Sequence, residues 1–229
     1  MSLELTLKSL AARLGFQIRR TPDAAWRRDA AFAAAFSRAA GRTLLDPERC
    51  FMLHQYALRA ARLPGDCAEV GVYQGGSASI LASALGGGGK ALHLFDTFAG
   101  MPPAETADRH KAGDFGDASL DSVREFLKDR PRVEFHPGLF PATAGSVSGA
   151  RFCLVHVDAD LYRSVLDACE FFVPRLVPGG LLVIDDYGAP TCPGVRKAVD
   201  EWFAGRPERP LALPTGQCVV EAPPAPRPA

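Results

Sequence analysis

The sequence lacks an excess of charge of either sign. It contains 26 basic and 26 acidic side chains among 229 residues, and 47% of its residues are hydrophobic. Proteins that bind nucleic acid or anionic lipid usually gather Lys and Arg on one face or in one tail, and a formal charge of zero gives no sign of such a surface. We therefore expect one sizeable globular domain with a small-molecule partner and no nucleic-acid partner.

Paired cysteines are also missing. The six cysteines are Cys50, Cys67, Cys153, Cys169, Cys192 and Cys218. They are scattered, with no CxxC pair and no metal-ligand spacing, which predicts reduced and mostly buried thiols. Reduced thiols favour a cytoplasmic protein.

Long apolar runs are absent as well. No stretch approaches the ~20 apolar residues that a membrane-spanning helix needs. The first segment, MSLELTLKSLAARLGF, is amphipathic, but charged residues interrupt it. It has neither the apolar core nor the small-residue cleavage site of a secretion signal. We expect no membrane span and a cytoplasmic location.

What the chain does have, after residue 65, is an alternation of short apolar runs with helical patterns. This is typical of βα units and predicts an α/β fold, Rossmann-like, with a mostly parallel sheet and helices on both faces. Strands are predicted at 67–72, 91–95, 132–136, 152–157, 180–184, 210–213 and 217–221. Helices are predicted at 3–15, 24–40, 46–62, 76–85, 118–129, 162–173 and 193–204. We expect a helical cap or lid over 1–64, the main domain over 65–222 and a disordered proline-rich tail over 223–229.

The first strand ends in the glycine-rich stretch AEVGVYQGGSAS. Gly71 and Gly75 permit a tight turn, and Ser77 stands where a helix begins, so free backbone N–H groups could hold a polar ligand. The spacing GVYQGG differs from the GxGxxG of dinucleotide sites. Glu69 would repel a pyrophosphate but would suit the ammonium and sulfonium charges of S-adenosylmethionine. A turn that serves packing alone stays an open alternative.

The second strand ends in LFDTFAGMPP. Asp96 is placed there to accept hydrogen bonds from a ribose diol, and it follows Glu69 by 27 residues, about one βαβ unit. A turn or helix N-cap aspartate is the alternative.

Four carboxylates follow the fourth and fifth strands, in VHVDADLY and LLVIDDYG. If the two strands are neighbours, these like charges meet, and at least one pKa rises sharply unless a cation intervenes. Oxygen-only ligands select a hard ion, Mg²⁺ above all, with Ca²⁺ or Mn²⁺ as substitutes. We assign Asp158, Asp185 and Asp186 to this metal and Asp160 to the N-cap of the following helix. The alternative for Asp158, Asp185 and Asp186 is that they are ordinary helix-cap or turn residues. Capping needs only one carboxylate, whereas these two strand ends supply three.

The histidines give no metal signal in sequence. No pair has metal-ligand spacing. His156 shares a strand face with Asp158 and is expected to be a hydrogen-bonded core residue. His93 falls in a predicted strand, and His136 at a strand end. No GxSxG stretch supports hydrolase chemistry.

Four stretches together resemble the macrocin O-methyltransferase type of class I methyltransferases, a group that includes sugar O-methyltransferases of macrolide and aminocoumarin biosynthesis. They are AEVGVYQGGSAS, LFDTFAGMPP, HVDADLYRSVLDACEFFVPRLVPGGLLVIDDY and PGVRKAVDEWF, and the resemblance spans residues 66–204. It implies an S-adenosylmethionine- and Mg²⁺-dependent O-methyltransferase that acts on a hydroxyl of a sugar or glycosylated natural product. It also implies that Asp158, Asp185 and Asp186 hold the ion and that Asp158 is the general base.

The resemblance further implies a set of cofactor contacts. These are Glu69, Gly71, Gly75, Ser77, Asp96, Thr97, Ser119 and Gly138. The first four match the segment that holds the methionine part, the next two match the ribose contact, and the last two match the adenine surround. Leu139 replaces the tryptophan that many relatives carry, and the N-terminal helices with the loop 99–117 resemble an acceptor lid.

Several readings stay open from sequence. A catechol or another phenol could replace the sugar as acceptor, or the pocket could belong to a non-catalytic nucleoside-binding protein. An NAD-dependent oxidoreductase ranks last because the glycine spacing is missing. The sequence is compatible with a homo-oligomer, and it names neither the acceptor nor the methylated position.

Overall fold

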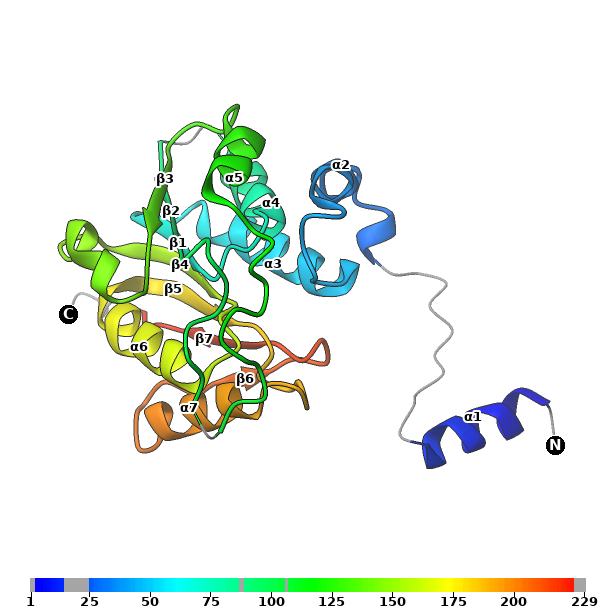
Figure 1. Cartoon of the computed structure of the whole chain (residues 1–229). Helices are drawn as coiled ribbons and strands as arrows, with labels where there is room; N and C mark the ends of the chain where they lie inside the picture. The colour runs from blue at the N-terminus through cyan, green and yellow to red at the C-terminus, as the bar shows by residue number, and fades with distance from the viewer. Residues whose placement is uncertain (1–2, 15–24, 87–88, 106, 225–229) are drawn as a thin grey trace, which may run out of the picture.

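A mostly parallel β-sheet organises the chain. The computed structural model describes residues 3–14, 25–86, 89–105 and 107–224. In these residues seven strands lie in the order β3-β2-β1-β4-β5-β7-β6 (Figure 1). The strands are β1 Asp66–Val70, β2 Leu92–Asp96, β3 Val133–Pro137, β4 Phe152–Val157, β5 Leu176–Ile184, β6 Leu211–Ala212 and β7 Cys218–Glu221. β1 to β5 run parallel, and β7 runs antiparallel to β5 and β6, which confirms the predicted fold class.

Helices cover both faces of this sheet (Figure 1). The α-helices are α1 Leu3–Arg13, α2 Ala30–Ala39, α3 Pro47–Ala60, α4 Gly76–Leu85, α5 Leu120–Leu127, α6 Tyr162–Phe172 and α7 Pro193–Phe203. Short 3-10 turns are η1 Ala25–Arg27, η2 Ala142–Val147 and η3 Val173–Arg175. α2, α3 and α4 share one hydrophobic cluster with the sheet, and α6 and α7 share the other with the opposite face.

Capping residues set where the cap helices begin. The Asp46 carboxylate accepts the backbone N–H of Arg49 at 2.8 Å and Pro47 occupies the first turn, which confirms the predicted start of α3. Asp29 accepts the N–H of Phe32 at 2.9 Å. Because Asp29 caps there, the predicted single helix over 24–40 is wrong: η1 comes first and α2 begins at Ala30.

The core lies around the central strands. β4 is buried along its whole length, as its continuous apolar sequence predicts. β5 begins at Leu176 rather than at residue 180, because Leu176 already pairs with Phe152 of β4. All six cysteines are free and buried, which confirms the expected reduced thiols. No helix of the described residues is long and apolar enough to cross a membrane.

The predicted cap consists of α1 to α3. α2 and α3 pack against α4, and α3 also contacts β4 and β5. Leu5, Leu7 and Leu10 of α1 are exposed. The proposed limits of cap, domain and tail stay predictions, and residues 225–229 of the predicted tail lie outside the described part of the chain.

Candidate functional site

A pocket of about 290 Å³ opens at the carboxyl ends of the parallel strands. Its walls come from the α2–α3 connection, the β1–α4 turn, the β2–α5 segment and the loops after β3, β4 and β5. In an open parallel sheet this edge is where ligands bind, because connections on either side of it diverge. The sequence predicts the site at this edge.

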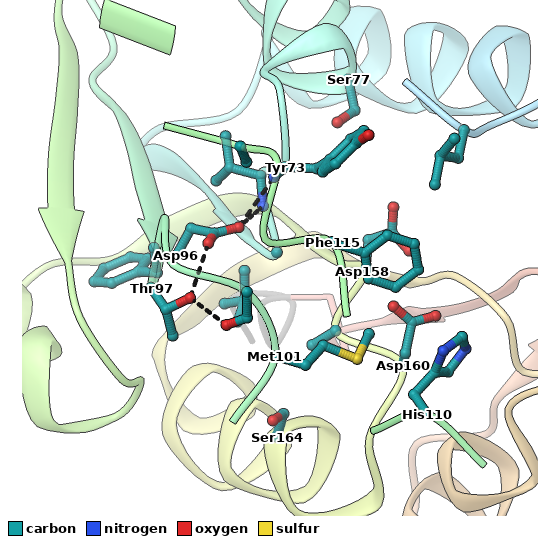
Figure 2. A pocket seen from close by; sticks show the side chains of 18 of the residues that line it. Tyr73, Ser77, Asp96, Thr97, Met101, His110, Phe115, Asp158, Asp160 and Ser164 are labelled. Carbon is teal, nitrogen blue, oxygen red and sulfur yellow. Dashed lines mark hydrogen bonds between the residues drawn. The ribbon is translucent and has the colours of Figure 1, made fainter. Parts of the chain in front are cut away.

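Asp96 ties the two turns of this wall together. Its Oδ2 accepts the backbone N–H groups of Val72 at 2.7 Å and Tyr73 at 3.0 Å (Figure 2). Its Oδ1 accepts the backbone N–H of Phe98 at 2.7 Å. The Thr97 hydroxyl donates to the Gly100 carbonyl at 2.6 Å. Asp96 therefore shapes the pocket through backbone contacts. Its predicted ribose contact stays a prediction.

Gly71 allows β1 and β4 to approach each other at the pocket floor. Its φ is +86°, a left-handed conformation, and a Cβ added there would lie 1.9 Å from the Asp158 carbonyl oxygen. Only glycine fits, so the position of Asp158 depends on the absence of a side chain at residue 71.

Three carboxylates face one another in the pocket. One oxygen each from Asp158, Asp160 and Asp186 lies within 4.8 Å of the others, and we call these residues the acidic cluster. Figure 2 shows Asp160 between Asp158 and His110. The set differs from the predicted one, because it contains Asp160 in place of Asp185.

The predicted N-cap role of Asp160 is wrong. Its φ is 56°, a left-handed conformation that aspartate tolerates better than most residues, and no side chain of the α6 N-cap residue bonds the helix. Instead, the carboxylate of Asp108 accepts the backbone N–H of Tyr162 at 2.8 Å. Asp160 is thereby free to accept from the Cys192 thiol at 3.3 Å.

Asp185 is buried and pairs with an arginine of α3 instead of lining the pocket. It is 1% exposed, and it is not among the described residues that line the pocket. Arg49 Nη1 donates to Asp185 Oδ2, and it also lies 3.2 Å from Asp186 Oδ1. Arg49 is thus the counter-ion that α3 brings to the paired aspartates. The role of Asp185 as a metal ligand stays a prediction.

Burial and repulsion raise the pKa values of Asp158 and Asp160. Burial first, then Asp185 and Asp160, raise the pKa of Asp158 well above its usual range. Burial and a hydrogen bond with Asp186 raise the pKa of Asp160 to about 7. At neutral pH such a cluster retains protons or gathers a cation. Its oxygen-only donors and partial burial fit a hard divalent ion.

A second buried pair lies on the same sheet, beneath the pocket. The Glu69 Oε1 and His156 Nδ1 atoms are 2.8 Å apart, and both side chains are fully buried. This confirms His156 as a hydrogen-bonded core residue. Glu69 is not among the described residues that line the pocket, so any influence on a ligand there would act through space.

The predicted cofactor residues divide into two groups. Those that line the pocket are Gly71, Ser77, Asp96, Thr97 and Gly138. Gly75 instead faces α5, where an added Cβ would lie 2.8 Å from the Val123 side chain. Ser119 caps α5 by accepting the N–H of Ser122 at 3.2 Å. The cofactor roles of all these residues stay predictions.

Sequence reasoning missed Arg49, His110 and Cys192, which all line the pocket. His110 Nε2 lies 3.6 Å from Cys192 Sγ, beside the acidic cluster. The signal for His110 was its place in the suspected lid loop. Arg49 had none, because it lies 136 residues before its partner Asp185 and only the packing of α3 on the sheet joins them.

Comparisons with known proteins point in one direction. The family model described as Macrocin-O-methyltransferase (TylF) matches residues 14–212. The chain is 34% identical over 157 residues to the 8-demethyl-8-(2,3-dimethoxy-alpha-L-rhamnosyl)-tetracenomycin-C 4'-O-methyltransferase of Streptomyces olivaceus, covering 61% of this chain and 58% of that one. It is 31% identical over 159 residues to the Mycinamicin III 3''-O-methyltransferase of Micromonospora griseorubida, covering 61% of each. The chain thus spans about three fifths of the length of these curated relatives.

The fold itself has solved counterparts. The structure of the O-methyltransferase NovP aligns with a TM-score of 0.70 at 23% identity, covering 80% of this chain and 82% of that one. At this identity the likeness concerns the fold alone, and it agrees with the predicted Rossmann-like α/β fold with a mostly parallel sheet.

Proposed function

The chain belongs to the macrocin O-methyltransferase family, and on that premise we propose that it is an S-adenosylmethionine- and Mg²⁺-dependent O-methyltransferase. Its acceptor would be a hydroxyl of a sugar or of a glycosylated natural product. Two relatives that are named for methylation at a 4' and a 3'' position support this acceptor class.

The observation that carries the proposal is the acidic cluster at the wall of the strand-end pocket. Three carboxylate oxygens within 4.8 Å suit a small hard cation, and Mg²⁺ with oxygen ligands commonly keeps positions open for substrate. The rest of the pocket is polar at Ser77 and Asp96 and apolar at Phe115 and Phe140, which suits a nucleoside.

Asp158 and Asp186 would hold the ion, and the third ligand distinguishes two arrangements. Asp160 already lies with them, whereas Asp185 would first have to release Arg49. Loss of Mg²⁺ affinity in Asp160→Asn, but not in Asp185→Asn, would assign the third position to Asp160. The opposite result would assign it to Asp185.

Bound S-adenosylmethionine would supply a methyl group on a sulfonium, and bound Mg²⁺ would supply the positive charge that makes a nearby hydroxyl more acidic. Asp158 would take the hydroxyl proton while the oxygen–carbon bond forms and the carbon–sulfur bond breaks, with the bond's electrons passing to sulfur. The turn at Gly71 would hold the donor in line with the acceptor, and such positioning supplies much of the rate.

An acceptor screen with the full chain tests the proposal. Purified protein, S-adenosylmethionine and Mg²⁺ would be incubated with rhamnosides and other glycosides and, in parallel, with catechols, and S-adenosylhomocysteine release would be measured. We expect turnover with a glycoside that EDTA abolishes and Mg²⁺ restores. Turnover confined to catechols would identify the acceptor as a phenol and not a sugar hydroxyl. Cofactor binding by calorimetry without turnover on any acceptor would support a nucleoside-binding protein.

A further inference from the structure

Two histidines and a glutamate meet at the outer edge of the sheet, away from the pocket. His93 of β2 pairs directly with Glu134 of β3 in the parallel ladder, and His136 follows two residues later on β3. Because side chains alternate along a strand, all three lie on one face. We call them the edge cluster. None is among the described residues that line the pocket.

Their ligand atoms have the spacing of a tetrahedral metal site. His93 Nδ1 lies 3.1 Å from His136 Nε2 and 3.4 Å from Glu134 Oε2, and all three atoms lie within 4.8 Å of one another. Zinc bonds of about 2.0–2.1 Å at tetrahedral angles place ligand atoms about 3.3 Å apart. We propose that the edge cluster binds a divalent transition-metal ion, Zn²⁺ foremost, with water in the fourth position.

The surroundings hold both imidazoles in orientation. Metal-binding histidines usually direct their second ring nitrogen at a carboxylate or another acceptor. His93 Nε2 faces Asp66 Oδ2 at 3.8 Å, and His136 Nδ1 faces the Ser146 hydroxyl of η2 at 3.4 Å. The Phe95 ring stacks on His136 with centroids 4.4 Å apart.

The competing explanation is a histidine–histidine hydrogen bond with Glu134 beside it by chance. That explanation gives Glu134, whose side chain is 56% exposed, no part in binding.

An ion in the edge cluster would stabilise the pairing of β3 with β2 at the edge of the sheet. β3 is the outermost parallel strand, and each of its residues is half-buried or exposed, so its packing is poorer than that of β4. β3 leads directly to Gly138 of the pocket wall. A metal that bridges β2 and β3 would stabilise the folded state by mass action.

Metal titration of the full chain tests the edge cluster. EDTA-treated and dialysed protein would be titrated with Zn²⁺ by calorimetry, with Mg²⁺ in excess to occupy the acidic cluster, and Co²⁺ absorption would report nitrogen ligation. Loss of an outer-shell partner already costs about 10- to 100-fold in metal affinity, so removal of a ligand in His136→Ala should cost more than about 100-fold. Glu134→Gln should also weaken binding and alter the Co²⁺ spectrum.

Glu134→Gln tests the ligand set in a folded protein, because the side chain of Glu134 is exposed and can change without unfolding the strand. Glu125→Gln on α5, also exposed, is the matched control and should bind Zn²⁺ like the parent. Zinc affinity that is unchanged in Glu134→Gln and His136→Ala, or a parent that binds no Zn²⁺ with Mg²⁺ in excess, would overturn the proposal. The failure or success of methyl transfer has no bearing on this result.

Discussion

The acidic cluster of the pocket and the edge cluster of the sheet assemble ligand atoms in opposite ways. Asp158, Asp160 and Asp186 come from loops after strands and carry like charge, and burial together with this repulsion raises the pKa values of Asp158 and Asp160. His93 and His136 come from within strands, and β-ladder register sets their distance. The first arrangement is costly without a cation, whereas the second is stable without one, because one imidazole can donate to the other. The repulsion among the carboxylates of the acidic cluster therefore favours binding of a cation in the pocket.

The largest effect on catalysis should follow from removing one charge from the acidic cluster. Asp158→Asn should lower kcat by about 10²–10⁴-fold, the range for loss of a general base, while S-adenosylmethionine affinity changes little. Glu134→Gln in the edge cluster should leave kcat unchanged. Steady-state kinetics and calorimetry measure both. If Glu134→Gln lowered kcat as much as Asp158→Asn does, the edge cluster would take part in catalysis and the two clusters would not be functionally separate.

Arg49 provides the next test, because it is the cation that the folded chain already supplies. Arg49→Met leaves Asp185 buried and uncompensated, and loss of one partner of a buried pair costs about 3–5 kcal/mol of unfolding free energy. Arg59→Met, which removes an exposed pair with Glu221, should cost about 0–1 kcal/mol.

Urea unfolding without metal compares the two arginine variants. Added Mg²⁺ should stabilise the parent and both variants by binding the acidic cluster. It should narrow the difference from the parent only in Arg49→Met, where the ion replaces a lost cation beside the aspartates. Equal losses in both variants would mean that Arg49 does not neutralise the buried aspartates.

A smaller effect should appear in the pH dependence of stability. Asp160 has a pKa of about 7 in the folded state and near 3.8 when unfolded. Between these values the folded protein holds a proton that the unfolded chain has released, so this group lowers stability as pH rises through the window. Metal-free protein should therefore lose unfolding free energy between about pH 4 and 7, and Asp160→Asn should flatten the slope. The same slope in both proteins would remove Asp160 as the cause.

The sequence predicted most of the fold because the parallel strands are short apolar runs whose ends are marked by polar residues. The motifs VDAD and IDDY placed Asp158 and Asp186 correctly at neighbouring strand ends. Asp160 was misassigned because Asp108, from a distant loop, caps α6 in its place, while Asp160 has a left-handed φ and lines the pocket. No local pattern encodes that exchange.

The residues that escaped prediction are joined only by tertiary packing. Arg49 reaches the aspartates because α3 lies across the sheet. His93 and His136 meet because β2 and β3 pair in one particular register, and a shift of one residue would put them on opposite faces. Predicted strand limits that are uncertain by a residue cannot fix such a register. Pairing of consecutive βαβ strands was the available hint.

Ser119 offers the smallest and most discriminating test, because the family resemblance and the geometry give it different roles. Ser119→Ala removes the side-chain acceptor at the start of α5 and should cost about 1 kcal/mol of unfolding free energy. Since Ser119 is not among the described pocket-lining residues, S-adenosylmethionine affinity should stay unchanged. Ser119→Asp, which retains an N-cap acceptor, should recover the stability. Calorimetry measures cofactor binding. Weaker binding in both variants would show that Ser119 contacts the adenine, as the family resemblance implies.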